Sequence, residues 1–420
     1  MIKRLLNKSD FIKSSFTLIF GTVLAQLIPI ALQPILRRIY TPEEFGLFAV
    51  YLSLIGMVVV AANLRYESTI VLPEDDDKAS NLVVGGFFIS LVFSLVLFIL
   101  LFFLGNNLIQ LLSLPKEISK WLYVLPFSVF VISCSRILNF WLTRKKAFKA
   151  SAINKIARRS SEGVIQTVGN TFQSSGLIIG NIVGDTVNLF VSILQSVKHG
   201  LSFRIYKFSI TKQQLIKYID FPKYSTISTL LNSVSLFLPV IIINHFYSQE
   251  VTGYFDLSRQ MLALPLALVS MAVSQVLIQK IVEYKQNRKK ITKLVTKIAL
   301  VLLAMSALGI LTIELFGIEL FTFIFGDEWE LSGKITQILI FSYAIKFVVS
   351  PLTSVFIALE KIKISSIWQV CYFLIICCLY FFKGLSINEF LLYYVVIDLI
   401  AYSMYYLLLI YVCKKYEKTL

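Results

Sequence analysis

The sequence predicts an all-α protein that crosses a membrane many times and consists of two similar halves. Two observations indicate this fold class: the composition is strongly apolar, and one short stretch of sequence occurs twice. Of the 420 residues, 57% are hydrophobic and only 15% are charged, whereas soluble domains contain about 25% charged residues. We therefore expect helices surrounded by lipid, since a helix satisfies its own backbone hydrogen bonds.

Twelve segments are apolar and long enough to span a hydrocarbon core of about 30 Å, which needs about 20 helical residues. The fifth is the most polar of them, and it is included because the topology requires it. The predicted spans are Phe16–Leu36, Phe45–Leu64, Leu82–Leu104, Leu122–Leu142, Gly163–Gly176, Leu177–Val197, Ser225–Phe246, Leu257–Leu277, Ile298–Phe316, Ile335–Leu359, Ile367–Phe382 and Leu391–Val412.

The repeated stretch lies at corresponding places in the two halves. Tyr40–Phe48 reads YTPEEFGLF and Tyr247–Phe255 reads YSQEVTGYF, with each matched pair 207 positions apart. Chance similarity of two membrane-edge turns is the alternative to duplication. Internal duplication is typical of secondary transporters, whose two half-bundles move around a site between them. Six spans in each half give both copies the same orientation, so a pseudo-two-fold axis is expected along the membrane normal.

These spans divide the chain into two lobes and a linker. We predict an N-terminal lobe over residues 1–198, a linker over 199–224 and a C-terminal lobe over 225–420. Basic and apolar residues alternate in the linker, a pattern typical of an amphipathic helix on a membrane surface. The residues concerned are Leu215, Ile216, Tyr218, Ile219, Lys212, Lys217 and Lys223.

The distribution of positive charge predicts that both termini lie in the cytoplasm. With this orientation about three quarters of the 40 Lys and Arg residues fall on the inner side, where short loops of membrane proteins carry them. The net charge of +16 therefore requires no nucleic acid partner. The first apolar segment is longer than a signal peptide core and lacks a small-x-small cleavage site, so we expect it to remain as a span.

No motif of a soluble enzyme occurs in the chain. There is no glycine-rich phosphate loop, no His–Glu metal pair and no Gly-x-Ser-x-Gly stretch. The five cysteines lie in or beside spans and are interpreted as small packing residues. We therefore predict no enzymatic activity, no cofactor and no metal site. Transport would be driven by an ion gradient, by the substrate gradient or by another subunit.

Polar side chains recur at helical spacing inside the apolar spans and so share helix faces. Such a face lines a water-filled cavity or forms hydrogen bonds to a neighbouring helix. The candidate cavity-lining residues are Gln26, Gln33, Asn181, Asn188, Asn232, Ser342 and Ser350.

Ionisable residues within spans are candidates for function, because each costs about 2.5–3.5 kcal/mol at a helix centre. The cations suit an anionic substrate, since planar guanidinium groups match phosphate, although an arginine near a helix end can instead extend to the interface. The candidate cations are Arg37, Arg65, Arg136, Arg259 and Lys346. Asp185 and Asp398 are candidate sites for a coupling proton or Na⁺, with an ion pair to a neighbouring Arg or Lys as the alternative.

Several stretches resemble one family of bacterial transporters. They are Gly21–Gln26, Arg38–Phe48, Leu64–Glu67, Ile70–Pro73, Phe221–Tyr224, Asn232, Gly253–Phe255, Arg259, Pro265 and Ser274–Val276. On these residues the chain resembles Wzx-type flippases of O-antigen or capsular-polysaccharide repeat units, within the multidrug/oligosaccharidyl-lipid/polysaccharide exporter superfamily.

The resemblance implies a MATE-like fold of two six-helix lobes. It also implies that undecaprenyl-pyrophosphate-linked oligosaccharide moves from the inner to the outer leaflet of the cytoplasmic membrane by alternating access, for O-antigen, capsule or exopolysaccharide assembly. Arg65 and Arg259 best match the family's motif positions. The implied partners are membrane lipids, a polysaccharide polymerase, a chain-length regulator and a coupling ion, H⁺ or Na⁺. Two further C-terminal helices, present in peptidoglycan-precursor flippases, are not expected here, which argues against that substrate.

Two rival functions remain open. A multidrug or cation antiporter of the same superfamily is expected to have a more acidic, aromatic cavity. A membrane-embedded polysaccharide polymerase or ligase is expected to carry a larger outer loop with catalytic residues. The candidate outer segments, Gly105–Ser119 and Gly317–Gly333, are short for such a loop.

Overall fold

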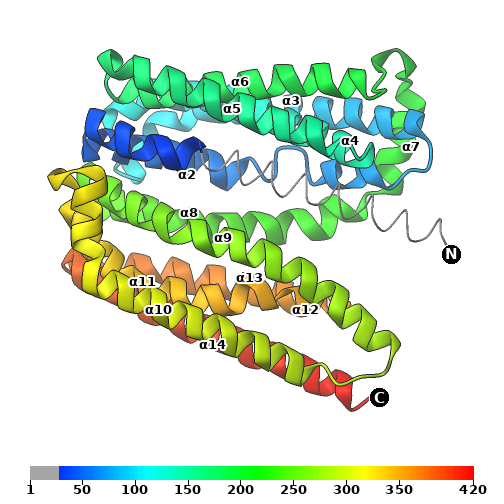
Figure 1. Cartoon of the computed structure of the whole chain (residues 1–420). Helices are drawn as coiled ribbons and strands as arrows, with labels where there is room; N and C mark the ends of the chain where they lie inside the picture. Colours follow the sequence, from blue (N-terminus) through cyan, green and yellow to red (C-terminus); the bar gives the residue numbers. More distant parts are fainter. Residues whose placement is uncertain (1–27) are drawn as a thin grey trace. The chain divides into compact units, whose positions relative to one another are not determined.

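The computed structural model describes residues 28–420, and every regular element in that range is helical (Figure 1). Nine of the described helices are long and apolar enough to cross a membrane. The chain is therefore a multi-pass membrane protein of the predicted all-α class. It divides into two compact units, one ending at Phe237 (unit 1) and one beginning at Leu238 (unit 2), and each is described by itself.

Unit 1 begins, within the described residues, with a helix over 28–39. The α-helices that follow are α2 (Pro42–Val58), α3 (Asp76–Leu111), α4 (Ser119–Arg144), α5 (Phe148–Val168), α6 (Ser174–Lys198), α7 (Phe208–Lys217) and α8 (Ile227–Phe246), which crosses into unit 2. Short 3₁₀ turns are η1 (Tyr66–Val71), η2 (Lys116–Ile118), η3 (Gly169–Phe172) and η4 (Phe203–Ile205), and η5 (Phe221–Thr226) is a π-helical turn.

Unit 2 contains the long helices that complete the chain. They are α9 (Gln249–Gln286), α10 (Thr292–Phe325), α11 (Glu330–Leu352), α12 (Ser354–Ala358), α13 (Ile362–Cys377) and α14 (Ile387–Glu417), with the 3₁₀ turns η6 (Asp327–Trp329) and η7 (Cys378–Phe381). Within this unit α11 packs against α9, α10 and α14. The central position of α11 buries several of its polar side chains, among them Ser332, Thr336 and Ser342, and this helix carries one of the predicted cations.

The two copies of the repeated stretch begin equivalent helices. Helix α2 starts at Pro42 and α9 starts at Gln249, which are themselves 207 positions apart. The Thr41 hydroxyl accepts a hydrogen bond from the Glu44 amide, and the Ser248 hydroxyl accepts one from the Val251 amide. Thr41 and Ser248 are both N-cap residues, so each copy of the repeated stretch contains the signal that starts a helix.

The tyrosines that open the two copies play the same role in their own units. In unit 1 the Tyr40 hydroxyl donates to the carbonyl of Gln166, near the end of α5, at 2.7 Å. In unit 2 the Tyr247 hydroxyl donates to the carbonyl of Leu385, just before α14, at 3.1 Å. Tyr40 thereby attaches the start of α2 to the last turn of α5, and Tyr247 attaches the start of α9 to the segment that precedes α14.

The prediction for the fifth span was wrong in position. A span was expected at Gly163–Gly176, but α5 covers Phe148–Val168 and the chain turns at η3. Arg158 and Arg159, which fall between the predicted fourth and fifth spans, consequently lie on α5. Hydropathy places the span too late because α5 is polar, and its polar side chains are satisfied by α6 rather than by water.

Hydrogen bonds and close backbone packing hold α5 against α6. The side-chain amide of Asn154 donates to the Ser192 hydroxyl at 2.9 Å, and the side-chain amide of Gln166 donates to the backbone carbonyl of Leu177 at 3.0 Å. A Cβ atom at position 184, which is glycine, would lie 2.8 Å from the Cβ of Glu162. Gly176, Gly180 and Gly184 recur every four residues, a small-residue spacing that lets membrane helices approach closely.

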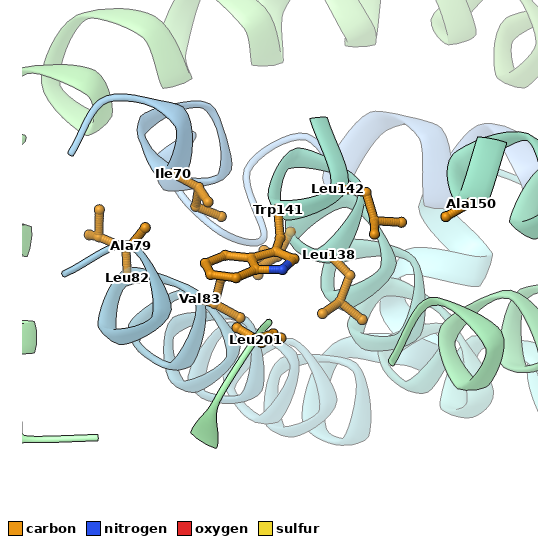
Figure 2. Packing of buried hydrophobic residues seen from close by; sticks show 10 residues of the cluster. Ile70, Ala79, Leu82, Val83, Leu138, Trp141, Leu142, Ala150 and Leu201 are labelled. Atoms are coloured by element: carbon orange, nitrogen blue, oxygen red, sulfur yellow. The ribbon is translucent and has the colours of Figure 1, made fainter. Parts of the chain in front are cut away.

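A buried apolar cluster surrounds Trp141 in unit 1 (Figure 2). The indole is fully buried and packs with Ile70 of η1, Val83 of α3 and Leu201, which precedes α7. Leu215 of α7 packs against the same cluster. The cluster therefore joins η1, α3 and α4 to the segment that connects the two halves.

Arg144, at the end of α4, holds the connection between η1 and α3. Its guanidinium donates to the carbonyls of Pro73 at 2.5 Å and of Glu74 at 3.0 Å, and to the Asp76 carboxylate at 3.0 Å. Lys145 forms a second ion pair with Asp76. These contacts fix the chain that leads out of the irregular segment after α2, where one of the predicted cations lies.

Candidate functional site

The second span is interrupted close to one of the predicted cations. Helix α2 ends at Val58, and Leu64 and Arg65 follow with φ angles of 49° and 65°, in the left-handed region. Non-glycine residues seldom adopt this region, and each such residue costs about 1–3 kcal/mol. Strained residues of this kind concentrate at functional sites. The interruption after α2 therefore marks the surroundings of Arg65 as a candidate functional site.

Arg65 is paired with a buried carboxylate two residues later. Its guanidinium lies 3.1 Å from the carboxylate of Glu67, whose side chain is 2% exposed, while 29% of the Arg65 side chain is exposed. The pair leaves the guanidinium partly open to a ligand. The prediction that Arg65 contacts the substrate stays a prediction.

A second charged group lies between the middles of α5 and α6. Arg158 lies 2.5 Å from the carboxylate of Asp185, and Arg159 lies 2.9 Å from that of Glu162. The amide of Asn181 donates to Glu162 at 3.2 Å. The ion-pair alternative for Asp185 is therefore realised, and Asn181, predicted to line a cavity, forms a helix-to-helix hydrogen bond.

Asp185 keeps one carboxylate oxygen without a hydrogen bond. Its Oδ1 atom accepts from Arg158, whereas its Oδ2 atom is buried and has no hydrogen-bond partner among the residues that the structure describes. A buried acceptor of this kind is costly unless something binds it. Asp185 thus retains one position at which a proton or a small cation could bind.

Arg136 of α4 lies between these two charged groups. It is close enough to interact electrostatically with Glu67 and Asp185, and also with Arg65 and Arg158. The side chain is half-buried, and it forms no ion pair or hydrogen bond within residues 28–420. Unlike Arg65, whose guanidinium is paired with Glu67, Arg136 therefore has a guanidinium that forms no direct ion pair among the described residues.

In unit 2, Lys346 of α11 is paired with Asp398 of α14. The two side chains approach to 2.5 Å, and they are 8% and 0% exposed. The hydroxyl of Ser342 donates to the same carboxylate oxygen at 2.5 Å, and the hydroxyl of Tyr372 donates to the other oxygen at 2.7 Å. Both predicted residues, Lys346 and Asp398, are thus brought together, and Ser342 orients the carboxylate.

Three tyrosine rings surround the Lys346 ammonium. The distances from Nζ to the ring centroids are 5.3 Å for Tyr343, 5.3 Å for Tyr394 and 5.5 Å for Tyr402. All three are within the range of cation–π attraction. These tyrosines were not among the predicted site residues, although Tyr343 precedes Lys346 closely and Tyr394 and Tyr402 flank Asp398 at helical spacing.

The remaining predicted cations also have neighbours that hold them. Arg259 lies 2.9 Å from Asp256, one turn earlier on α9. Arg37 is 1% exposed; it donates to Gln33 at 3.0 Å, and its guanidinium carbon stands 3.4 Å over the ring of Phe45. Arg37 is thus held between Gln33, one turn earlier, and Phe45 of α2.

The other polar candidates are dispersed. Asn188, Asn232 and Ser350 are half-buried on α6, α8 and α11. Gln26 lies outside the described residues. Within the described part of the chain, no group of three His, Cys, Asp or Glu side chains could hold a metal ion.

The family model described as polysaccharide biosynthesis protein matches residues 35–333 of the chain. Among curated proteins, the succinoglycan biosynthesis transport protein ExoT of Rhizobium meliloti (strain 1021) is 22% identical over 317 residues, which are 74% of this chain and 62% of the relative. The chain therefore spans less than two thirds of the length of that relative.

Solved structures of similar fold cover nearly the whole chain. An inward-facing multidrug resistance MATE family transporter of the MOP superfamily matches with a TM-score of 0.75 and 14% identity, over 94% of this chain and 96% of that one. The lipid II flippase MurJ in an inward closed conformation matches with a TM-score of 0.72 and 16% identity, over 94% and 87%. At this identity the likeness concerns the fold, and it confirms the predicted MATE-like architecture.

Proposed function

We propose, from the premise that the chain belongs to the polysaccharide biosynthesis protein family, that it is a flippase for lipid-linked oligosaccharide repeat units. The family match, which covers residues 35–333, is the observation that carries this proposal. The substrate has an undecaprenyl-pyrophosphate carrier, and the product belongs to an O-antigen, a capsule or an exopolysaccharide. Two proteins to which the chain is similar, a succinoglycan biosynthesis transport protein and a lipid II flippase, support this class of cargo.

In the proposed cycle the headgroup crosses the membrane by alternating access while the polyprenyl tail stays in lipid. The pyrophosphate needs positive charge in place of the water that hydrated it. Arg136 supplies the first contact, because its guanidinium forms no ion pair with a carboxylate among the described residues, and Arg65 supplies a further contact from its partly exposed ion pair with Glu67. The role of Arg259 in substrate binding, predicted from the sequence, stays a separate prediction for unit 2. Planar guanidinium groups give two parallel hydrogen bonds to phosphate oxygens.

We place the coupling site, for H⁺ or Na⁺, at Asp185. The Oδ2 atom of Asp185, which is buried and accepts no hydrogen bond from the described residues, supports this assignment. Asp185 is paired with Arg158, and both interact electrostatically with Arg136. A proton or Na⁺ bound to Asp185 would neutralise its carboxylate and weaken the ion pair with Arg158. We propose that this loss of negative charge beside Arg158 and Arg136 links ion binding to headgroup binding.

Deletion of the gene that encodes this protein, in its native host, tests the proposed function. We expect loss of the surface or secreted polysaccharide and accumulation of lipid-linked repeat units whose sugars remain on the inner leaflet, measured by extraction and mass spectrometry. Normal polysaccharide together with increased sensitivity to cationic drugs would contradict the flippase and favour the multidrug antiporter. Polysaccharide precursors that reach the outer leaflet but stay unpolymerised would favour a polymerase.

The orientation is proposed from the charge distribution: the protein lies in the bacterial cytoplasmic membrane with both termini inside. We expect single cysteines at Glu117 and Glu328, both exposed, to react in intact cells with an impermeant maleimide. A cysteine at the exposed Asn287 should react only after the cells are opened. The five native cysteines are replaced in all variants. Labelling of Asn287 in intact cells would contradict the orientation.

A further inference from the structure

The Lys346 ammonium occupies a site with the chemistry of a binding site for a small cation. It lies 2.5 Å from an oxygen of Asp398 and 3.5 Å from the hydroxyl of Tyr394. The faces of the Tyr343, Tyr394 and Tyr402 rings close around it at 5.3–5.5 Å. A carboxylate combined with several aromatic faces is the arrangement by which proteins recognise free ammonium groups.

The carboxylate is built to hold one positive charge at this point. Asp398 is completely buried, and hydroxyl groups of Ser342 and Tyr372 each donate to it, which fixes its orientation. A buried carboxylate without a cation is strongly disfavoured. With Lys346 present the charges balance, so this pocket needs no ion from solution.

We propose that Lys346 is a tethered cation that fills a binding site for a small monovalent cation in unit 2. The wild-type protein therefore takes up no ion at Asp398, and its own lysine is the permanent occupant. This assigns the ammonium to the protein's carboxylate rather than to a substrate pyrophosphate. Removal of the ammonium opens a pocket that ammonium, a primary alkylammonium or Na⁺ can occupy.

The chemistry of the pocket favours monovalent over divalent cations. It offers a single carboxylate, whereas Ca²⁺ requires six to eight oxygen ligands and Mg²⁺ a near-octahedral set. The three ring faces add attraction for weakly hydrated cations, and a primary ammonium can also donate hydrogen bonds to Asp398 and to Tyr394. A primary alkylammonium is therefore the expected best occupant of the vacated pocket.

The test is chemical rescue of Lys346→Ala, measured as thermal unfolding of the purified protein in a buffer whose only other cation is the bulky N-methyl-D-glucamine. Titration with n-propylammonium, which replaces the atoms that the substitution removes, is expected to raise Tm saturably by several degrees. Ammonium and Na⁺ should act more weakly, and tetrabutylammonium, which is too large, should not act. The wild-type protein is expected to show no response to any of these cations.

Two matched variants separate a cation site from general salt effects. Lys346→Ala combined with Asp398→Asn should be insensitive to cations, because the carboxylate that attracts them is neutralised. Lys334→Ala removes a lysine from the exposed pair with Glu330, at 2.7 Å, and should also show no response. Equal responses in Lys346→Ala and in the double variant would overturn the proposal, as would a Tm of Lys346→Ala that no cation changes.

If Lys346→Ala is not recovered folded, the same cations are added during solubilisation and the yield of monodisperse protein is measured. The proposal expects n-propylammonium to restore the yield and Asp398→Asn to restore it without any cation. Restoration by Asp398→Asn alone, with no effect of the cations, would identify an ordinary structural ion pair and overturn the proposal. The proposal rests on contacts within unit 2, and these readouts do not depend on transport, so failure of the proposed function leaves them interpretable.

Discussion

Arg136→Ala is expected to abolish most of the export of polysaccharide while leaving the protein folded. A hydrogen bond to a charged group contributes about 1.5–3 kcal/mol, so loss of the guanidinium should reduce transport roughly 10- to 150-fold. Stability should change little, because Arg136 forms no ion pair within the described residues and its removal leaves no carboxylate without a partner. Transport of a lipid-linked repeat unit in proteoliposomes and Tm of the same preparation measure the two effects.

Two further variants sharpen this test. Arg136→Lys keeps the positive charge but loses the planar pair of donors, so it should recover only part of the transport if the guanidinium geometry matters. Lys280→Ala removes a cation from an exposed pair with Glu283, at 3.3 Å, and should transport normally. Unchanged transport by a stable Arg136→Ala protein would contradict the assignment of Arg136 to the headgroup.

A large effect on stability is expected for Arg158→Ala. This change leaves Asp185, which is 3% exposed, as a buried charge without its partner. Breaking a buried ion pair by removal of one member costs about 3–5 kcal/mol, and the lower end applies here because 27% of the Arg158 side chain is exposed. We expect a clear fall in Tm and a lower yield of folded protein from membranes.

The double variant with Arg158→Met and Asp185→Asn is the matched comparison. Replacing both charges by side chains of similar size should restore most of the lost stability, since desolvation of the two ions is no longer required. Transport by this double variant should nevertheless remain low if Asp185 is the coupling site. A double variant as unstable as Arg158→Ala would show that the two side chains do not act as a pair, and full transport would refute the coupling role.

The sequence alone predicted the features that depend on local chemistry. Hydropathy located most of the long helices, because a helix in lipid must be apolar along most of its length. The repeat at Tyr40 and Tyr247 located two equivalent helix starts, because an N-cap depends on residues within one turn. Several of the charged residues of the candidate site, among them Arg136, Asp185 and Lys346, were likewise recognisable, since ionisable groups are expensive in a span.

The pairing of these groups was decided by the tertiary structure. The fifth span was misplaced because hydropathy treats Arg158 and Glu162 as exposed, whereas α6 supplies partners for both. The recurrence of Gly176, Gly180 and Gly184 was the sequence signal that could have indicated a closely packed neighbour of α6. Without the position of α5, Arg158 could not be recognised as a member of the charged group.

Lys346 and Asp398 illustrate the same division. Each was identified from its own span, and either could have faced a cavity or a neighbouring helix. They belong to α11 and α14, 52 positions apart in the chain, and only the packing of these helices brings them to 2.5 Å. The sequence shows which charged side chains are costly to bury, because it shows which of them lie within apolar spans. Which opposite charge offsets that cost depends on which helix faces meet, and only the folded chain decides this.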